Sequence, residues 1–247
     1  MQRMFGTFFF WSFFMVSGLI MQLILKIKCM SISHDASKQR LAQHFRLRWS
    51  AQTLRFFLGV PALEELKKKV SHLPEQFILI SNHRSNLDPL LVAVIARPLV
   101  FLSKKSVLKT PVVGRWMRLC GDVSVDRSEK SSREESLNQM RNRLERGDSL
   151  LIFPEGTRQT DPNTPLGDFR DGAFNLASQS GVPIVALVLK DTDFIWRKGS
   201  FVLDLKPLQF AVSDPIQSVG RDARELKDHA IQTMKNMIQS LTVEQQI

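Results

Sequence analysis

The stretch NHRSNLDP, from Asn82 to Pro89, follows the apolar run Phe77–Ile80 and decides how the rest of the chain is interpreted. A run of about four apolar residues bounded by polar ones is typical of a buried strand. In α/β proteins, ligands bind where such strands end. The polar stretch contains His83, and Asp88 follows it after four intervening residues. The sequence therefore predicts an α/β fold with a functional site at the end of this strand.

His83 and Asp88 have the properties of a general base and its partner. Histidine has an ordinary pKa of about 6.5, so a neutral ring takes up a proton near neutral pH. A carboxylate beside Nδ1–H holds the tautomer in which Nε2 is free, and it stabilises the protonated ring. Pro89 suits the first position of a helix, which makes Asp88 the predicted N-cap. The alternative interpretation is a strand-end turn with a surface histidine and a capping aspartate.

A second polar stretch, FPEGTR from Phe153 to Arg158, also follows a strand-like apolar run, Leu150–Phe153. Parallel strands end at the same edge of a sheet, so we expect this stretch to lie near His83. The intervening residues Ser132–Glu135 have the pattern of a capping box, which predicts a crossover helix that leads into the second strand.

The two motifs, in this order and at this spacing, resemble the first and third motifs of the glycerolipid acyltransferases. The closest resemblance is to the bacterial 1-acylglycerol-3-phosphate acyltransferases of the PlsC type, and it extends from about Leu73 to about Asp214. It implies a glycerol-3-phosphate acyltransferase-like fold, in which helices flank a mixed sheet. It also implies that His83 and Asp88 catalyse acyl transfer.

The same resemblance implies which residues bind the acceptor. The FPEGTR motif is expected to hold its glycerol phosphate. The stretch from Ser103 to Pro111, followed by Val125–Arg127, matches the family's second block and adds two cations. Lysine is a mobile point charge and arginine a planar fork, and both suit a phosphate. The expected acceptor-binding residues are Lys104, Arg127, Glu155, Gly156, Thr157 and Arg158.

The chain departs from the family pattern at three places. Ser106 and Val107 replace a Glu-Leu pair, Asp171 replaces the second of two basic residues, and Ala186 stands where a proline is usual. The departure at Asp171 argues against a phosphate-binding role for that position.

The composition narrows the class of partner. The chain has 247 residues and a formal net charge of +10, which predicts anionic partners such as nucleic acid, a membrane surface or phosphorylated substrates. Most phenylalanines lie in the first sixty residues rather than among the basic residues of the later chain, which favours lipid over nucleic acid. The two cysteines are expected to be unpaired thiols, and no metal-ligand spacing is present, so we expect no metal and no cofactor.

The segment Met4–Leu25 is uncharged and rich in phenylalanine. It is long enough to span a bilayer with some tilt, and longer than the apolar core of a signal peptide. We therefore predict a retained membrane helix that either spans the bilayer or lies in one leaflet. Basic residues flank both ends and only slightly favour a cytoplasmic body.

The segment Ala36–Leu58 is predicted to be a basic amphipathic helix with one side on lipid and one on protein. The predicted domains are a membrane segment, 1–58, and a catalytic domain, 59–247, with a hinge at Gly59–Pro61. A last helix with the apolar stripe Leu226, Ala230 and Met234 completes the scaffold.

The sequence favours an enzyme that transfers an acyl chain from acyl-CoA or acyl-carrier protein to the sn-2 hydroxyl of lysophosphatidic acid. The resemblance places it at the bacterial inner membrane, with the catalytic domain on the cytoplasmic side. Two alternatives remain: another lysolipid acceptor, or a non-catalytic protein that binds membrane surfaces. The second alternative leaves the His83–Asp88 spacing and the FPEGTR motif unexplained.

Overall fold

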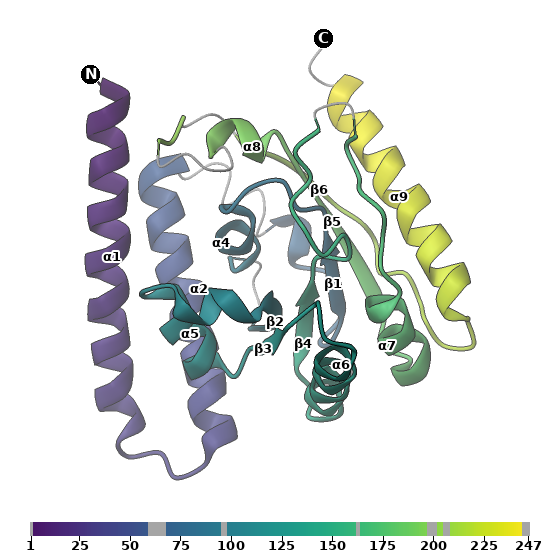
Figure 1. Cartoon of the computed structure of the whole chain (residues 1–247), viewed down its shortest axis with the longest axis horizontal. Helices are drawn as coiled ribbons and strands as arrows, with labels where there is room; N and C mark the ends of the chain where they lie inside the picture. Colours follow the sequence, from purple (N-terminus) through teal and green to yellow (C-terminus); the bar gives the residue numbers. More distant parts are fainter. Residues whose placement is uncertain are drawn as a thin grey trace.

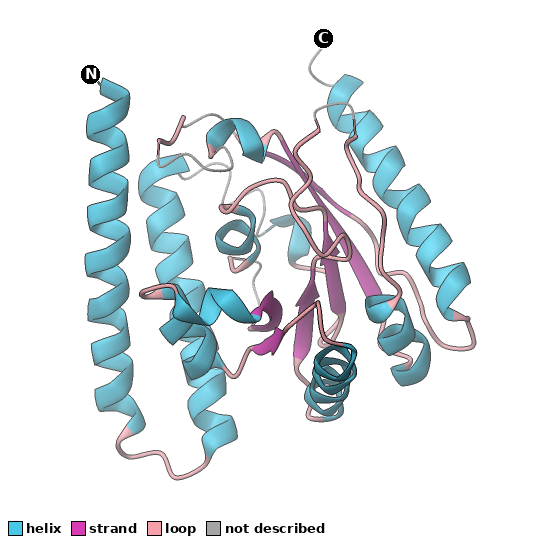
Figure 2. Ribbon diagram, viewed as in Figure 1, coloured by secondary structure: helices cyan, strands magenta, loops and turns pink. Residues whose placement is uncertain are grey.

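A six-stranded sheet with helices on both faces forms the body of the protein in a computed structural model that describes residues 2–58, 68–94, 98–161, 164–196, 202–204 and 208–243 (Figures 1 and 2). The strand order is β3-β2-β4-β1-β5-β6. The strands are β1 (Ile78–Ser81), β2 (Leu99–Lys104), β3 (Val123–Val125), β4 (Ser149–Ile152), β5 (Ile184–Lys190) and β6 (Gln209–Val212). All pairings are parallel except that of β5 with β6. The prediction of a mixed sheet flanked by helices is therefore confirmed.

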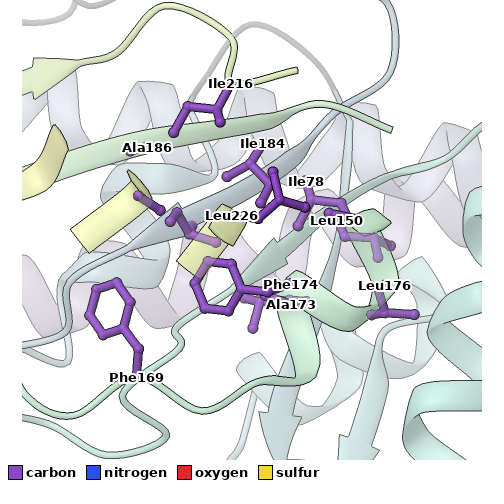
Figure 3. Packing of buried hydrophobic residues seen from close by; sticks show 14 of the residues in the cluster. Ile78, Leu150, Phe169, Ala173, Phe174, Leu176, Ile184, Ala186, Ile216 and Leu226 are labelled. Atoms are coloured by element: carbon purple, nitrogen blue, oxygen red, sulfur yellow. The ribbon is translucent and has the colours of Figure 1, made fainter. Parts of the chain in front are cut away.

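Alternate residues of the central strands face two separate cores. In β1 and β4, Ile78 lies beside Leu150 and Ile80 beside Ile152. All four side chains enter the core on the side of α6 (Lys130–Glu145), α7 (Gly172–Ser180) and α9 (Ala223–Val243), part of which Figure 3 shows. Such continuous apolar strands are expected when both faces of a parallel sheet are covered.

The other face of the sheet is covered by α2 (Asp35–Leu58) and the short helix α4 (Asp88–Val92). Leu79 and Leu151 point to this side, where they pack with Leu54 of α2 and Leu91 of α4. The remaining elements are α1 (Gln2–Cys29), the 3-10 helix η1 (Lys105–Lys109), α5 (Val113–Cys120) and α8 (Thr192–Ile195).

A third apolar cluster joins α1, α2 and α5. Phe14 of α1 packs on Trp49 of α2 with ring centroids 4.7 Å apart, and Trp49 stacks on Trp116 of α5 at 5.8 Å. Gly18 permits this close approach, because a Cβ there would lie 2.6 Å from Val112. Trp49 is therefore covered by protein, which makes this the protein-facing side of α2, and the predicted contact of another side with lipid stays a prediction. The long apolar helix α1 covers the side that carries Trp49.

Two predicted helix starts are wrong. Helix α6 begins at Lys130, before the predicted capping box, and the Ser132 hydroxyl accepts a hydrogen bond from the Asp126 N–H. Leu87 rather than Asp88 is the N-cap of α4, because the Asp88 carboxylate turns back toward the preceding loop. In both cases the side-chain oxygen bonds N–H groups of the preceding loop instead of the helix. The predicted hinge at Gly59–Pro61 lies outside the described residues.

Candidate active site

The site lies where β1 and β4 end next to each other at one edge of the sheet. After β1, the Asn82 amide bonds both the N–H and the carbonyl of Leu189 in β5, which fixes the chain direction just before His83. After β4, the motif that begins at Phe153 turns back beside His83, and the Gln159 N–H donates to the His83 carbonyl at 2.8 Å. The two motifs are therefore brought together as predicted.

His83 Nδ1 lies 2.8 Å from Asp88 Oδ2. The same carboxylate oxygen accepts the backbone N–H groups of Arg84 at 2.8 Å and Ser85 at 2.7 Å. The Asp88 side chain is fully buried, whereas that of His83 is 18% exposed. An acceptor on the Nδ1 side selects the tautomer that leaves Nε2 free as a base.

The His83 ring is held on its face as well as at Nδ1. It stacks on the Phe153 ring with centroids 4.2 Å apart and an interplanar angle of 23°. Phe153 is the first residue of the second motif, so the two motifs are in direct side-chain contact. This packing leaves the imidazole few orientations other than the one that faces Asp88.

Glu155 is 5% exposed and lies directly behind the histidine loop. Its Oε1 accepts the His83 N–H at 3.1 Å. Burial raises the pKa of Glu155 to about 7, although the His83 and Gly167 N–H groups and Arg84 act in the opposite direction. The carboxylate thus supports the loop that carries His83, and its predicted contact with the acceptor stays a prediction.

Gly156 has a φ of +69°, which favours glycine because a side chain is strained there. A Cβ at this position would lie 2.6 Å from Nε of Arg170. The half-buried Arg127 has its pKa lowered by desolvation and by the charge of Arg170. Two arginines close enough to repel each other beside a glycine turn form an anion-attracting surface.

The other predicted cations lie around this turn. Arg158 Nη1 donates to Asn86 Oδ1 at 2.5 Å, which places Arg158 on the histidine loop. Lys104 is exposed at the end of β2, opposite Val125 of β3. The pKa of the nearby Asp126 is lowered by hydrogen bonds from Ser128 and, to a smaller extent, by the charges of Lys105 and Lys104. Thr157 is exposed. The predicted acceptor-binding residues therefore share one edge of the sheet, and their roles stay predictions.

Arg84 is a site residue that the sequence did not reveal. It is 8% exposed, and its guanidinium forms two hydrogen bonds with Asp193 of α8, at 3.1 and 3.0 Å. It also donates to the carbonyls of Asp161 and Thr164, which follow the FPEGTR motif. Its place between His83 and Ser85 was visible, but its partners are more than seventy residues away. Arg170 was visible in the same way, as the remaining basic residue before Gly172.

The part of the chain that the structure describes contains no group of three or more His, Cys, Asp or Glu side chains arranged to hold a metal. Cys29 and Cys120 are free thiols, and burial raises the pKa of Cys120 to about 12.

Comparisons with known proteins found a matching family model and several relatives of this chain. Residues 63–190 match a family model described as Acyltransferase. A 1-acyl-sn-glycerol-3-phosphate acyltransferase of Saccharomyces cerevisiae is 29% identical over 210 residues, which cover 81% of this chain and 68% of the yeast protein. An enzyme of the same name from Chlamydomonas reinhardtii is 31% identical over 78% of this chain and 56% of the algal protein. A third, from Limnanthes douglasii, is 35% identical over 60% of this chain and 52% of the plant protein. The chain thus spans only a little over half of the algal and plant relatives.

The fold is also found in a solved structure. The crystal structure of the 1-acyl-sn-glycerophosphate acyltransferase PlsC from Thermotoga maritima superposes with a TM-score of 0.79, covering 98% of this chain and 96% of that one at 17% identity. The chain therefore has the α/β fold of that structure, with a histidine–aspartate pair beside an arginine-bearing loop. The chain belongs to the acyltransferase family, because the family model matches more than half of it.

Proposed function

We propose that the protein transfers an acyl chain from an acyl thioester to the sn-2 hydroxyl of 1-acylglycerol-3-phosphate, which gives phosphatidate. The observation that carries this proposal is the His83–Asp88 contact of 2.8 Å beside the FPEGTR loop. The relatives from yeast, alga and plant that are named for this reaction support the choice of acceptor.

In the proposed reaction, His83 Nε2 accepts the proton of the acceptor hydroxyl while the hydroxyl oxygen attacks the thioester carbonyl. Asp88 stabilises the imidazolium that forms. A C–O ester bond forms, the C–S bond breaks, and the proton passes from His83 to the departing thiolate. The sequence has no Gly-x-Ser-x-Gly nucleophile motif, which favours direct transfer over an acyl-enzyme.

The acceptor phosphate is proposed to bind between the histidine loop and the Gly156 turn. Arg158 approaches from the side of Asn86, and Arg127 and Arg170 from the far side of the turn. Lys104, at the neighbouring strand end, adds a longer-range positive charge. Charge-assisted bonds from guanidinium to phosphate are about twice as strong as neutral ones, so several arginines suit a phosphomonoester.

We propose that the enzyme works on a membrane, with α1 lying in one leaflet. Helix α1 is long and apolar enough to cross a bilayer, with a candidate span at Gly6–Cys29. However, it packs lengthwise on α2, and one side of it stays exposed and apolar. A helix that is bound to the body along its length cannot span unless the polar body follows it, so insertion from one side is favoured. The proposed location is the bacterial inner membrane, with the catalytic domain on the cytoplasmic side, where acyl-CoA or acyl-carrier protein donates.

The test is a panel of acceptors offered to the purified full chain in detergent. Lysophosphatidic acid, lysophospholipids with larger head groups, and monoacylglycerol are each combined with acyl-CoA and with acyl-carrier protein. We expect ester formation to be fastest with lysophosphatidic acid. Faster transfer to another lysolipid would contradict lysophosphatidic acid as the acceptor. No transfer with any pair of acceptor and donor would contradict the proposed acyltransferase activity.

The phosphate contact is tested by Arg158→Lys, which keeps the charge and loses the planar fork. We expect KM for lysophosphatidic acid to rise about tenfold or more, as for a lost bidentate contact, with a smaller change for the thioester. Arg170→Lys serves as the matched variant on the other side of the turn. An equal loss of kcat/KM on monoacylglycerol would instead mean that Arg158 supports the loop.

A further inference from the structure

A cavity of about 270 Å³ lies between the C-terminal half of α1, the start of α2 and α5. It is distinct from the acyltransfer site, because none of its lining residues belongs to the two motifs. Its lining includes Gln22, Leu25, Lys26, Lys38, Arg115 and Leu119. Figure 1 shows these helices at the side of the molecule, with α1 outermost.

All charged side chains that line the cavity are basic. Lys38 pairs with Asp35 at 3.3 Å, and both side chains are well exposed. Lys26 and Arg115 have no hydrogen-bond or ion-pair partner within the described ranges. Cations gathered around a partly apolar hollow attract an anion that also carries apolar groups.

Gln22 provides a second, independent observation. Its side chain is 1% exposed, and its Nε2 donates to the Val112 carbonyl at 2.9 Å. Its Oε1 is buried and has no hydrogen-bond donor among the described residues. Buried polar atoms are normally paired, so the unpaired Oε1 of Gln22, a residue that lines the cavity, indicates a missing donor. A ligand with a hydroxyl group would supply that donor.

The cavity borders the apolar outer side of α1. Leu23 lies three positions before Lys26, about one turn along α1, and Met30, which lines the cavity, follows directly after the end of the helix. They are 59% and 81% exposed. A lipid whose acyl chains lie along this side of α1 would bring its head group to the cavity.

We infer that the cavity binds the head group of an acidic phospholipid of the surrounding bilayer. Lys26 and Arg115 bind the phosphate, and Gln22 Oε1 accepts a hydrogen bond from a head-group hydroxyl. Phosphatidylglycerol has both features. The inference depends on attachment of α1 to a membrane and is independent of acyl transfer, since it concerns a resident lipid rather than a substrate.

The test places the full chain in nanodiscs with equal amounts of phosphatidylglycerol and phosphatidylcholine and counts retained lipids by native mass spectrometry. We expect one phosphatidylglycerol to be retained per chain, in preference to phosphatidylcholine. Lys26→Gln with Arg115→Gln should lower that preference about thirtyfold, since each of the two cations near an acidic head group contributes on the order of 1 kcal/mol.

The matched control is Lys28→Gln with Arg48→Gln, which removes the same charge from exposed positions of α1 and α2 outside the cavity. We expect the control to keep the preference within about twofold, because its charges are screened by water. Equal losses in both double variants would mean diffuse surface attraction and would overturn the site. Equal retention of the two lipids would also overturn it. Displacement of the lipid by excess inorganic phosphate would point to a free-anion site instead. The readout needs no turnover, so it stands apart from the proposed reaction.

Discussion

His83 Nδ1 and two backbone N–H groups converge on a single oxygen of Asp88, and the other oxygen, Oδ1, has no partner among the described residues. An amide could therefore place its oxygen at the Oδ2 position and keep all these contacts. What an amide cannot supply is the negative charge that stabilises the imidazolium. Replacing Asp88 by asparagine thus separates the geometry of the pair from its electrostatics.

We predict that Asp88→Asn folds normally and lowers kcat, and that His83→Ala lowers it further. General-base catalysis contributes about 10²–10⁴-fold, so His83→Ala should lose activity within that range. Steady-state rates with lysophosphatidic acid, alongside circular dichroism spectra, provide the measurement. Full activity of a folded His83→Ala protein would contradict the role of His83 as the base.

Glu155 makes stability depend on pH in a direction unusual for a carboxylate. Its pKa is raised from 4.5 to about 7, mainly by burial. Below pH 4.5 the Glu155 carboxyl is protonated in both the folded and the unfolded states, so it does not lower the free energy of unfolding. Between the two pKa values the unfolded state releases its proton first, so stability falls as pH rises. Above pH 7 the carboxyl is ionised in both states, and the free energy of unfolding falls no further.

We predict that Glu155→Gln reduces the loss of unfolding free energy between pH 5 and pH 8 by about 3 kcal/mol, the equivalent of the raised pKa. Urea unfolding in detergent at the two pH values gives the difference. Glu145→Gln, an exposed position on α6, is the control and should leave the pH dependence unchanged. The same pH dependence in parent and Glu155→Gln would show that the carboxylate is not desolvated.

At the scale of elements, α2 is tied to the sheet by a buried ion pair. Arg46 of α2 bonds the Asp122 carboxylate and the Leu99 carbonyl, and its guanidinium lies over the Phe101 ring at 3.9 Å. The Asp122 side chain is fully buried. Helix α2, which the sequence analysis assigned to the membrane segment, is therefore anchored directly to the sheet.

Arg46→Ala is predicted to lower the free energy of unfolding by about 3–5 kcal/mol, because it leaves the Asp122 charge buried and unpaired. Arg48→Ala, an exposed arginine of the same helix, should change it by less than about 0.5 kcal/mol. Thermal unfolding of both variants measures the contrast. Adding Asp122→Leu to Arg46→Ala should recover part of the loss, and its failure to do so would show that packing rather than charge was lost.

At the scale of the whole molecule, α1 has two sides with different partners. Phe10, Phe14 and Leu25 are buried against the body. Along the helix, other large apolar side chains are exposed: Phe8, Phe9, Val16, Leu19, Ile20, Leu23, Ile24 and Ile27. An exposed apolar surface of this extent marks an interaction with a membrane or a protein.

Replacing Phe8, Leu19 and Leu23 with glutamine is predicted to release the protein from vesicles while keeping its fold. Each of these side chains contributes about 1.5–3 kcal/mol when it leaves water, so binding should fall by about a hundredfold or more. Vesicle sedimentation measures the bound fraction, and Val219→Gln, at an exposed loop position, is the control. Unchanged sedimentation of the triple variant would contradict attachment through α1. Deleting α1 is a poorer test, because it uncovers Trp49 and Trp116.

Features encoded over a few neighbouring residues were predictable from the chain alone. The apolar runs at Phe77–Ile80 and Leu150–Phe153 predict strands because they are short, continuous and followed by polar residues, and those polar residues mark the site. His83 and Asp88 are separated by only four residues, so their contact could also be predicted from the local sequence. The mixed sheet followed from the family resemblance that these motifs carry.

Partners that lie far apart in sequence were decided by tertiary structure alone. Glu155 accepts a hydrogen bond from the His83 N–H, and Arg84 binds Asp193. Local patterns contain no information on these contacts, because a side-chain oxygen or guanidinium bonds whichever group the fold brings to it. The same holds for α2: its apolar pattern predicted a buried side, and only the position of α1 decided that protein rather than lipid covers Trp49.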